Sequence, residues 1–287
     1  MIAYVARRAT LRQAQGGRDV EQVQVEPTAP ILLFDSGVGG LSVLAELRNV
    51  LPDAPVLYVG DTAGLPYGSK SEAEIAARVC GLLGRLAERY HPRLICIACN
   101  TASTIALAMV RDVLEVPIVG TVPAIKPAAA LTKTGVIGLL GTEATIRQSY
   151  VDRLEADHAA GKRLIRHAAP ELVAAAELKL RGGTPDPAVF TRIATSLQSS
   201  ADELCDTVVL ACTHFPLLAD ELALAFGPNV RFVDGAKGIA QRIAHLTLGQ
   251  PFHRATPDKA LFTGHEDAAM LAPALAQYGL ALDAAIG

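Results

Sequence analysis

Several features that would assign this chain to a common class of protein are missing from its sequence. Its 287 residues carry 26 basic and 29 acidic side chains, a formal net charge of −3. Such a balance offers no excess positive charge for nucleic acid or an anionic membrane. The uncharged run 94–110 is interrupted by polar residues and is too short for a convincing membrane span. We therefore expect neither nucleic acid nor a membrane as a partner.

The sequence signatures of common cofactors are also missing. The stretch 37–42 reads GVGGLS, and Ser42 occupies the place of the last glycine in G-x-G-x-x-G, so a dinucleotide fingerprint is unsupported. No Walker lysine motif occurs, and no lysine stands in a context that singles it out for a pyridoxal Schiff base. We expect activity without an organic cofactor.

Cysteine is sparse, and its spacing is not that of a small disulfide scaffold. The cysteines lie in or beside apolar segments: Cys80, Cys96, Cys99, Cys205 and Cys212. The apolar run 2–6 is too short for the core of a secretory signal. We expect reduced thiols in a cytoplasmic protein.

Apolar runs and helical patterns alternate along the chain, in which 51% of the residues are hydrophobic. The runs predicted as strands are 31–34, 56–60, 93–98, 116–120, 135–140, 163–167, 207–211 and 230–233. Helical patterns such as 41–51, 171–180 and 187–204 stand between them. This alternation favours parallel sheets. We predict an α/β fold of two similar open parallel-sheet domains, with the active site in the cleft between them.

Composition suggests where these domains divide. Residues 1–30 form a polar N-terminal extension, and the proline-punctuated stretch Val122–Pro127 is the best candidate for a crossing between domains. We predict a first α/β domain from 31–121 and 236–287 and a second from 122–235. The first domain is discontinuous because the end of the chain is expected to return to its sheet.

Two short stretches repeat one arrangement: ACNT around Cys99 and ACTH around Cys212. Each ends an apolar run, and polar residues that open a helical pattern follow it. Open α/β sheets bind ligands beyond the carboxyl ends of their strands. A helix N-terminus there lowers a thiol pKa and can hold a carboxylate. Two such ends facing each other would place an acid and a base on opposite faces of one carbon atom.

Three other titratable residues are candidates for the same site. His214 can point the same way as the Cys212 sulfur if the backbone stays extended, and would then activate the thiol. Asp35 ends the first strand; it either caps the next helix or belongs to a ligand site, where the glycines of GVGG suit close backbone approach. Glu177, in an alanine-rich helix, is from the pattern alone equally a solvated residue.

The cysteines also allow two other kinds of site. Cys96 and Cys99 form a C-x-x-C, which keeps a thiol redox protein as an alternative. It ranks lower because Cys96 lies inside the strand and faces its core. A zinc tetrad with Cys212 and His214 ranks lower still, because the turn residues of a zinc knuckle are absent. We predict no metal site.

Taken together, the motifs resemble those of glutamate racemases. The matching residues are Asp35-Ser36-Gly37 with GVGG, Pro66-Tyr67-Gly68, Cys99-Asn100-Thr101-Ala102, Gly141-Thr142 with Thr145, and Cys212-Thr213-His214 with Pro216. The resemblance runs from about residue 31 to residue 249. It implies a cytoplasmic isomerase that interconverts L- and D-glutamate for bacterial peptidoglycan synthesis, and so for cell wall biogenesis and cell shape. The family uses no cofactor.

The resemblance also implies a role for each matching residue. Cys99, helped by Asp35, resembles the base for D-glutamate, and Cys212, helped by His214, the base for L-glutamate. Glu177 matches the family's catalytic-site glutamate. The substrate-holding positions are matched by Ser36, Pro66, Tyr67, Gly68, Asn100, Thr101, Thr142, Thr145 and Thr213. Ala169 departs from the family, in which many members have cysteine before the proline.

Two further functions and two partners stay open. A racemase of the same superfamily acting on aspartate or a related amino acid is the main alternative, and a sensor of a cell-wall precursor without turnover is another. Some glutamate racemases with an N-terminal extension depend on a peptidoglycan precursor as activator, which the segment 1–30 makes relevant here. A homodimer is also open.

Overall fold

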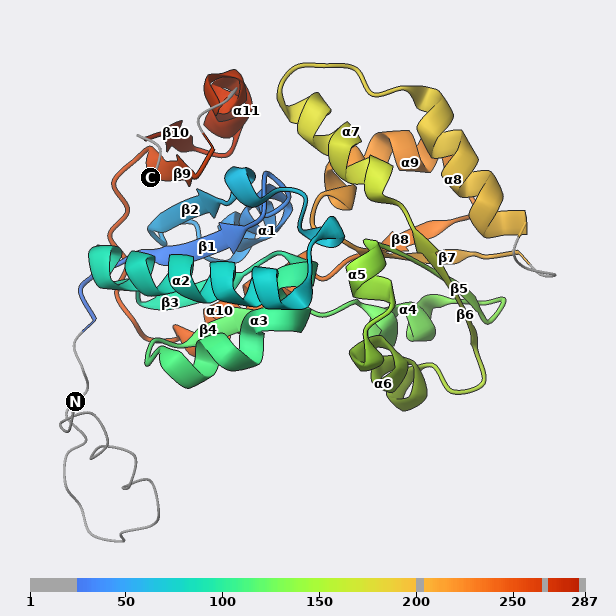
Figure 1. Cartoon of the computed structure of the whole chain (residues 1–287), viewed down its shortest axis with the longest axis horizontal. Coiled ribbons are helices and arrows are strands. Elements are labelled where there is room, and N and C mark those ends of the chain that lie inside the picture. Colours follow the sequence, from blue (N-terminus) through green and yellow to red (C-terminus); the bar gives the residue numbers. More distant parts are fainter. Residues whose placement is uncertain (1–24, 200–203, 265–267, 284–287) are drawn as a thin grey trace, which may run out of the picture.

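The computed structural model describes residues 25–199, 204–264 and 268–283. These residues form two parallel β-sheets side by side, each packed with helices on both faces (Figure 1). The two sheets confirm the predicted fold class. None of the described helices is long and apolar enough to cross a membrane.

The first sheet has six parallel strands. Their order is β10 (Leu280–Leu282), β9 (Asp258–Phe262), β2 (Val56–Gly60), β1 (Ile31–Asp35), β3 (Leu94–Ile97) and β4 (Ile118–Gly120). Every residue of β1, β2 and β3 is buried, as expected for central strands covered on both sides. The end of the chain supplies β9, which pairs with β2, so the predicted return to the first sheet is present.

Helices cover both faces of this sheet. Helices α1 (Leu41–Val50) and α10 (Ala236–Leu246) pack on one face, and α2 (Glu72–Tyr90) and α3 (Asn100–Val113) on the other. The short η4 (Ala268–Leu271) and α11 (Ala272–Gln277) join the first layer. Helix α2 begins where the Ser71 hydroxyl accepts the Glu74 N–H, and ends at His91, whose φ is 45°. A side-chain cap at the start and a left-handed residue at the end are both typical of helix termini.

The second sheet has four parallel strands and its own two helical layers. Its order is β6 (Arg163–Ala168), β5 (Val136–Gly141), β7 (Thr207–Ala211) and β8 (Arg231–Val233). One face packs against α4 (Ile125–Leu131), α5 (Glu143–Ile146) and α6 (Ser149–His158). The other face packs against α7 (Pro170–Leu180), α8 (Pro187–Ser199) and α9 (Ala219–Phe226).

Three details bear on the expectations from sequence. The segment after Cys212 first forms a turn and the 3-10 helix η3 (Phe215–Leu218), and α9 begins only at Ala219. Helix α8 is described to Ser199, and the rest of its predicted length falls partly on residues 200–203, outside the described residues. Residues 1–24 of the predicted extension also lie outside them, and the domain boundaries at 121 and 235 remain predictions.

Candidate active site

A cavity of about 610 Å³ lies between the two sheets, beyond the carboxyl ends of their strands. Its volume is in the range of small-molecule sites. We call each sheet, with its helices and loops, a unit. The first unit lines the cavity with Ser36, Leu65, Pro66, Tyr67, Gly68, Ser69, Cys99, Asn100 and Thr101. The second unit lines it with Thr142, Glu143, Pro170, Val173, Ala174, Glu177, Cys212 and His214. The structure therefore brings both candidate thiols to one cavity from opposite units.

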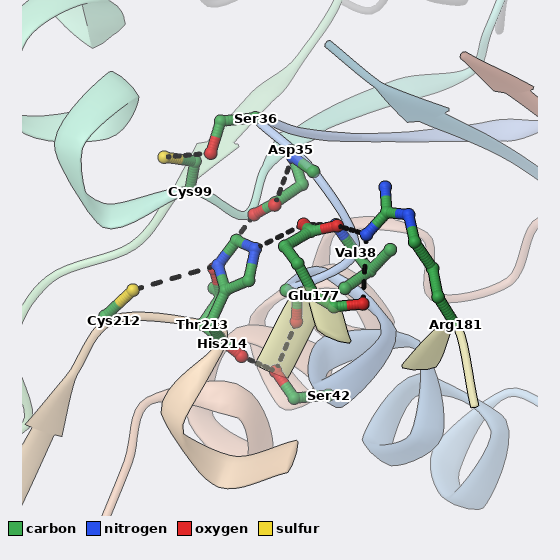
Figure 2. A network of polar contacts seen from close by, with 12 residues as sticks. Asp35, Ser36, Val38, Ser42, Cys99, Glu177, Arg181, Cys212, Thr213 and His214 are labelled. Carbon is green, nitrogen blue, oxygen red and sulfur yellow. Dashed lines mark hydrogen bonds and ion pairs between the residues drawn. The ribbon is translucent and has the colours of Figure 1, made fainter. Parts of the chain in front are cut away.

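Cys99 lies at the entrance to a long helix. It is the N-cap residue of α3, directly after β3, and its side chain makes no capping hydrogen bond. Its thiol donates instead to the Ser36 hydroxyl, at 3.5 Å (Figure 2). Burial, followed by the negative charge of Asp35, raises the pKa of the Cys99 thiol to about 12. The thiol of Cys99 thus keeps its proton at neutral pH.

Cys212 has a different partner. Its sulfur lies 3.9 Å from Nδ1 of His214, and both side chains are buried (Figure 2). The expected condition for this contact, an extended backbone, is wrong. The chain turns after Cys212, and His214 has helical backbone angles, φ −71° and ψ −31°. The turn brings the ring back toward the sulfur.

Glu177 contacts His214 on the side away from Cys212. The three residues Cys212, His214 and Glu177 form a series of polar contacts, called the relay below. Its Oε1 lies 2.8 Å from Nε2 of His214 and accepts the Val38 N–H at 2.9 Å, while Oε2 is paired with Arg181. Because an ionised carboxylate only accepts hydrogen bonds, Nε2 of His214 carries a proton and Nδ1 faces the sulfur. Glu177 is 6% exposed, so it is not a solvated helix residue.

Electrostatics favours charge on both members of this pair. Burial alone would raise the pKa of Glu177, but the contacts with His214, the Val38 N–H and Arg181 outweigh it and lower that pKa to about 2. Burial alone would lower the pKa of His214, but the contacts with Cys212 and Glu177 raise it well above its ordinary value. An imidazolium in this position favours negative charge on the Cys212 sulfur.

Asp35 is fully buried at the end of β1. Its carboxylate accepts the Gly37 N–H and the Thr213 hydroxyl, both at 2.9 Å. It does not cap α1, whose N-cap position is Gly40 without a side-chain hydrogen bond. Its described hydrogen bonds go to the turn after Cys212 and to its own loop rather than to Cys99. Asp35 affects Cys99 through its charge.

The glycines after Asp35 lie against the relay. A Cβ atom on Gly37 would lie 2.1 Å from Oε1 of Glu177, and one on Gly39 would lie 2.5 Å from Nδ1 of His214. Neither glycine lines the cavity. Close backbone approach is therefore needed here, as the GVGG motif indicates, but it is approach to Glu177 and His214 rather than to a ligand.

The threonines matched to substrate-holding positions divide into two groups. The hydroxyls of Thr101, Thr142 and Thr145 lie 3.0 to 3.2 Å from one another. Thr101 and Thr142 line the cavity, whereas Thr145 is fully buried behind them. Thr213 does not line the cavity and donates to Asp35. Two of these four residues thus support the site without facing it.

The loop that contains Pro66, Tyr67 and Gly68 is anchored by contacts outside the cavity. Pro66, Tyr67 and Gly68 line the cavity, and the hydroxyl of Tyr67 donates to the buried carboxylate of Asp61. Asp61 is also bound by the guanidinium of Arg78. These contacts fix Tyr67 between α2 and the cavity.

Sequence reasoning missed part of the lining. The missed residues are Leu65, Ser69, Glu143, Pro170, Val173 and Ala174. Pro170, Val173, Ala174 and Glu177 share one face of α7, at positions i, i+3, i+4 and i+7, and this spacing was available in the sequence. The loop residues Leu65 and Ser69 carried no such signal.

The position of Cys96 bears on the two alternative uses of cysteine, a C-x-x-C redox site and a zinc tetrad. Cys96 is completely buried in the layer beneath α1 and α10, and it does not line the cavity. All cysteines are free. Among the described residues, no group of three or more histidine, cysteine, aspartate or glutamate side chains is arranged to hold a metal ion. Cys96 therefore does not share the cavity with Cys99.

The chain belongs to the Asp/Glu/Hydantoin racemase family, because the sequence model of that family matches residues 41–243. A glutamate racemase from Sphingopyxis alaskensis is 61% identical over 243 residues, covering 84% of this chain and 91% of that protein. One from Escherichia coli K12 is 45% identical over 221 residues, 77% of each chain. The crystal structure of Escherichia coli glutamate racemase in complex with L-glutamate and the activator UDP-MurNAc-Ala has a TM-score of 0.83 and 41% identity, covering 90% of this chain and 100% of that one.

Proposed function

We propose that this chain is a glutamate racemase, an isomerase that interconverts L- and D-glutamate without cofactor or metal. The observation that carries the proposal is the placement of Cys99 and Cys212 in one cavity, each delivered by a different parallel sheet. The named glutamate racemases that resemble the chain over most of its length support the choice of substrate. Cys212 and Cys99 act as base and acid on opposite faces of Cα.

The reaction asks more of the site than thiol basicity. The Cα proton of an amino acid is a far weaker acid than a thiol of pKa about 8.5. The site must therefore stabilise the carbanion by charge and by exclusion of water. In the L-to-D direction, the Cys212 thiolate takes the Cα proton, the carbanion forms, and the Cys99 thiol donates a proton to the other face. The negative charge thereby passes from one sulfur to the other.

The polar groups that line the cavity suit a dicarboxylate without a salt bridge. None of the described lining residues is lysine or arginine. We assign the carboxylates of glutamate to neutral donors: Ser36, Gly68, Asn100, Thr101 and Thr142, with Pro66 and Tyr67 shaping the wall and Thr145 and Thr213 supporting them. Asp35, Glu177 and His214 act with the two cysteines. Cys99, as the N-cap of α3, also exposes its sulfur to the positive end of that helix.

The test is circular dichroism on each pure enantiomer of glutamate with purified protein. We expect the signal of either enantiomer to decay to zero, and activity to survive a chelator and hydroxylamine. A protein that stays inactive until metal or pyridoxal phosphate is added would refute the proposal. Saturable binding of glutamate without isomerisation would favour the sensor instead.

The same assay separates glutamate from aspartate. Binding energy from the longer side chain should raise turnover as well as affinity, so we expect a higher kcat/KM for glutamate. Equal values for the two amino acids would favour the alternative racemase.

Biological context follows from the same reaction. D-Glutamate supply serves peptidoglycan, and the activator in the Escherichia coli complex leads us to propose that a precursor of the UDP-MurNAc-Ala class stimulates this chain. Adding that compound to the assay tests this directly. The mechanism requires reduced thiols, which supports a cytoplasmic location. Homodimer formation stays a prediction, checked by sedimentation.

A further inference from the structure

Arg181 lies behind Glu177, outside the cavity proposed to hold substrate. It follows the last residue of α7, one helical turn after Glu177. Its Nη1 donates to Oε2 of Glu177 and, at 3.0 Å, to the backbone carbonyl oxygen of the same residue. It lines a second cavity, of about 330 Å³, between α7 and α11. Figure 2 shows it on the far side of Glu177 from His214. Arg181 therefore does not line the cavity proposed to hold substrate.

The contacts of Arg181 continue an uninterrupted series to the second thiol. Cys212 meets His214 at 3.9 Å, His214 meets Glu177 at 2.8 Å, and Glu177 is paired with Arg181. We propose that Arg181 is a positioning residue that holds the Glu177 carboxylate against His214 and so sets the charge state of the His214–Cys212 pair. This role rests on the racemase function proposed above.

The two carboxylate oxygens of Glu177 have different partners, and this explains why the position of the carboxylate depends on Arg181. Oε1 serves both Val38 and His214, while Oε2 depends on Arg181. Without the guanidinium, a buried carboxylate oxygen would lose its charged donor, which is costly. The carboxylate would then rotate or bind a proton, and either change weakens its hold on His214. The second bond of Arg181, to the helix carbonyl, fixes the guanidinium and leaves it little freedom.

Arg181 also contributes a positive charge to a crowded group. Asp35, Tyr58 and Cys99 face the relay from the first unit. Beside Arg181, the second cavity presents Tyr278 and Lys179, and Lys179 is already paired with Glu221. Removing the charge of Arg181 leaves the relay with a net charge one unit more negative. Glu177 then binds a proton more readily, because its contact with Arg181 is one of the causes that lower its pKa. A protonated Glu177 no longer favours the positive charge on His214.

The experiment compares Arg181→Gln, Arg181→Lys and the matched control Arg166→Gln. Arg166 also pairs with two carboxylates, Asp152 and Glu155, and does not line the substrate cavity. In Arg181→Gln we expect kcat to fall about tenfold with KM within about twofold of wild type. The alkaline limb of the kcat/KM profile should move down by about half a pH unit, because His214 then loses its proton at lower pH. Arg181→Lys should return the limb to its wild-type position, and Arg166→Gln should change neither quantity.

Two results would overturn the role of Arg181. One is an unchanged pH profile in Arg181→Gln, and the other is a raised KM with unchanged kcat, which would place the residue in substrate binding. If Arg181→Gln does not fold, a shifted limb in Arg181→Lys overturns the role, because Arg181→Lys is expected to keep the limb at its wild-type position. Titration of the His214 ring by NMR needs no turnover. A shift to lower pH in Arg181→Gln supports the role, and no shift or a shift to higher pH overturns it, even if the wild type fails to racemise glutamate.

Discussion

Cys99 and Cys212 occupy equivalent places in two similar units, yet their surroundings differ. Each follows a buried parallel strand and lines the same cavity. Cys99 begins a 14-residue helix and donates to one hydroxyl, that of Ser36. Cys212 begins a tight turn and faces an imidazole backed by a carboxylate. Similar backbone geometry therefore presents one thiol beside a neutral hydroxyl and one thiol beside a titratable imidazole.

The difference shows how a symmetric reaction can use an asymmetric site. The two enantiomers of glutamate have equal free energies in water, so kcat/KM must be equal in the two directions whatever the surroundings of each sulfur. The asymmetry can affect only kcat and KM taken separately and the resting distribution of protons. At rest, burial keeps the proton on Cys99, whereas Cys212, the proposed base for L-glutamate, lies beside the imidazole of His214.

Removing either sulfur should have the largest effect and tests whether the two sites are equally necessary. Cys99→Ser and Cys212→Ser should each lower racemisation by about a thousandfold, because every turnover needs one thiolate and one thiol. Circular dichroism measures the loss, with Cys80→Ser on α2 as the control. In deuterated water, deuterium should enter the product enantiomer well before the remaining substrate. Full activity in either serine variant, or equal early labelling of both enantiomers, would show that a single base is enough.

Removing the partner of each thiol should sharpen the contrast between them. His214→Asn should lower kcat about a hundredfold because Cys212 loses its imidazole. Ser36→Ala should lower kcat only about threefold because Cys99 loses one neutral hydrogen bond. Steady-state kinetics with each enantiomer of glutamate measures kcat for the two variants. Equal losses in the two variants would contradict the asymmetry.

Crowding the relay without touching a thiol should have an intermediate effect. In Gly37→Ala the new Cβ would meet Glu177, whose carboxylate must move away from His214. We expect kcat to fall by about tenfold to a hundredfold. Gly84→Ala in α2 is the control, because a Cβ there meets nothing within 4 Å. Wild-type kcat in Gly37→Ala would show that Glu177 can shift without consequence.

The pH profile should give the smallest effect, a displacement of one limb. Activity toward L-glutamate requires protons on Cys99 and His214 and is lost as pH rises through their pKa values. Burial raises the pKa of Cys99 to about 12, and contacts with Cys212 and Glu177 raise that of His214. The alkaline limb should therefore lie above the ordinary histidine value of about 6.5. Glu177→Gln should lower the pKa of His214 and move the alkaline limb down by about one pH unit. The measurement is kcat/KM against pH for both proteins. An alkaline limb at the same pH in both would contradict the prediction.

Most of the fold could be predicted from the sequence because its signals are local. The alternation of apolar runs with helical patterns indicated parallel sheets. The boundary errors have local causes as well: Pro216 falls at the start of a 3-10 helix, where the helical pattern suggested a longer one. The pairing of β9 with β2 joins distant parts of the chain, and only the general return of the chain was predictable.

The site was less accessible, since its contacts cross between the units. The two cysteines stood out because their surroundings repeat. That Asp35 would bind Thr213, or that Gly37 would make room for Glu177, depends on how the two sheets meet. Arg181 is visible as an i, i+4 partner of Glu177 in the sequence, but its importance appears only once Glu177 is buried beside His214.

The return of β9 to β2 has a consequence for the order in which the chain is made. β2 leaves the ribosome early. All strands of the second sheet are then synthesised before β9, the strand that pairs with the free edge of β2. During that interval a fully apolar strand, VLYVG, has open N–H and C=O groups along one side. Such an edge recruits strands from other chains. Nascent chains that end before residue 258 are therefore expected to aggregate, and the final strands complete the sheet that the first strands began.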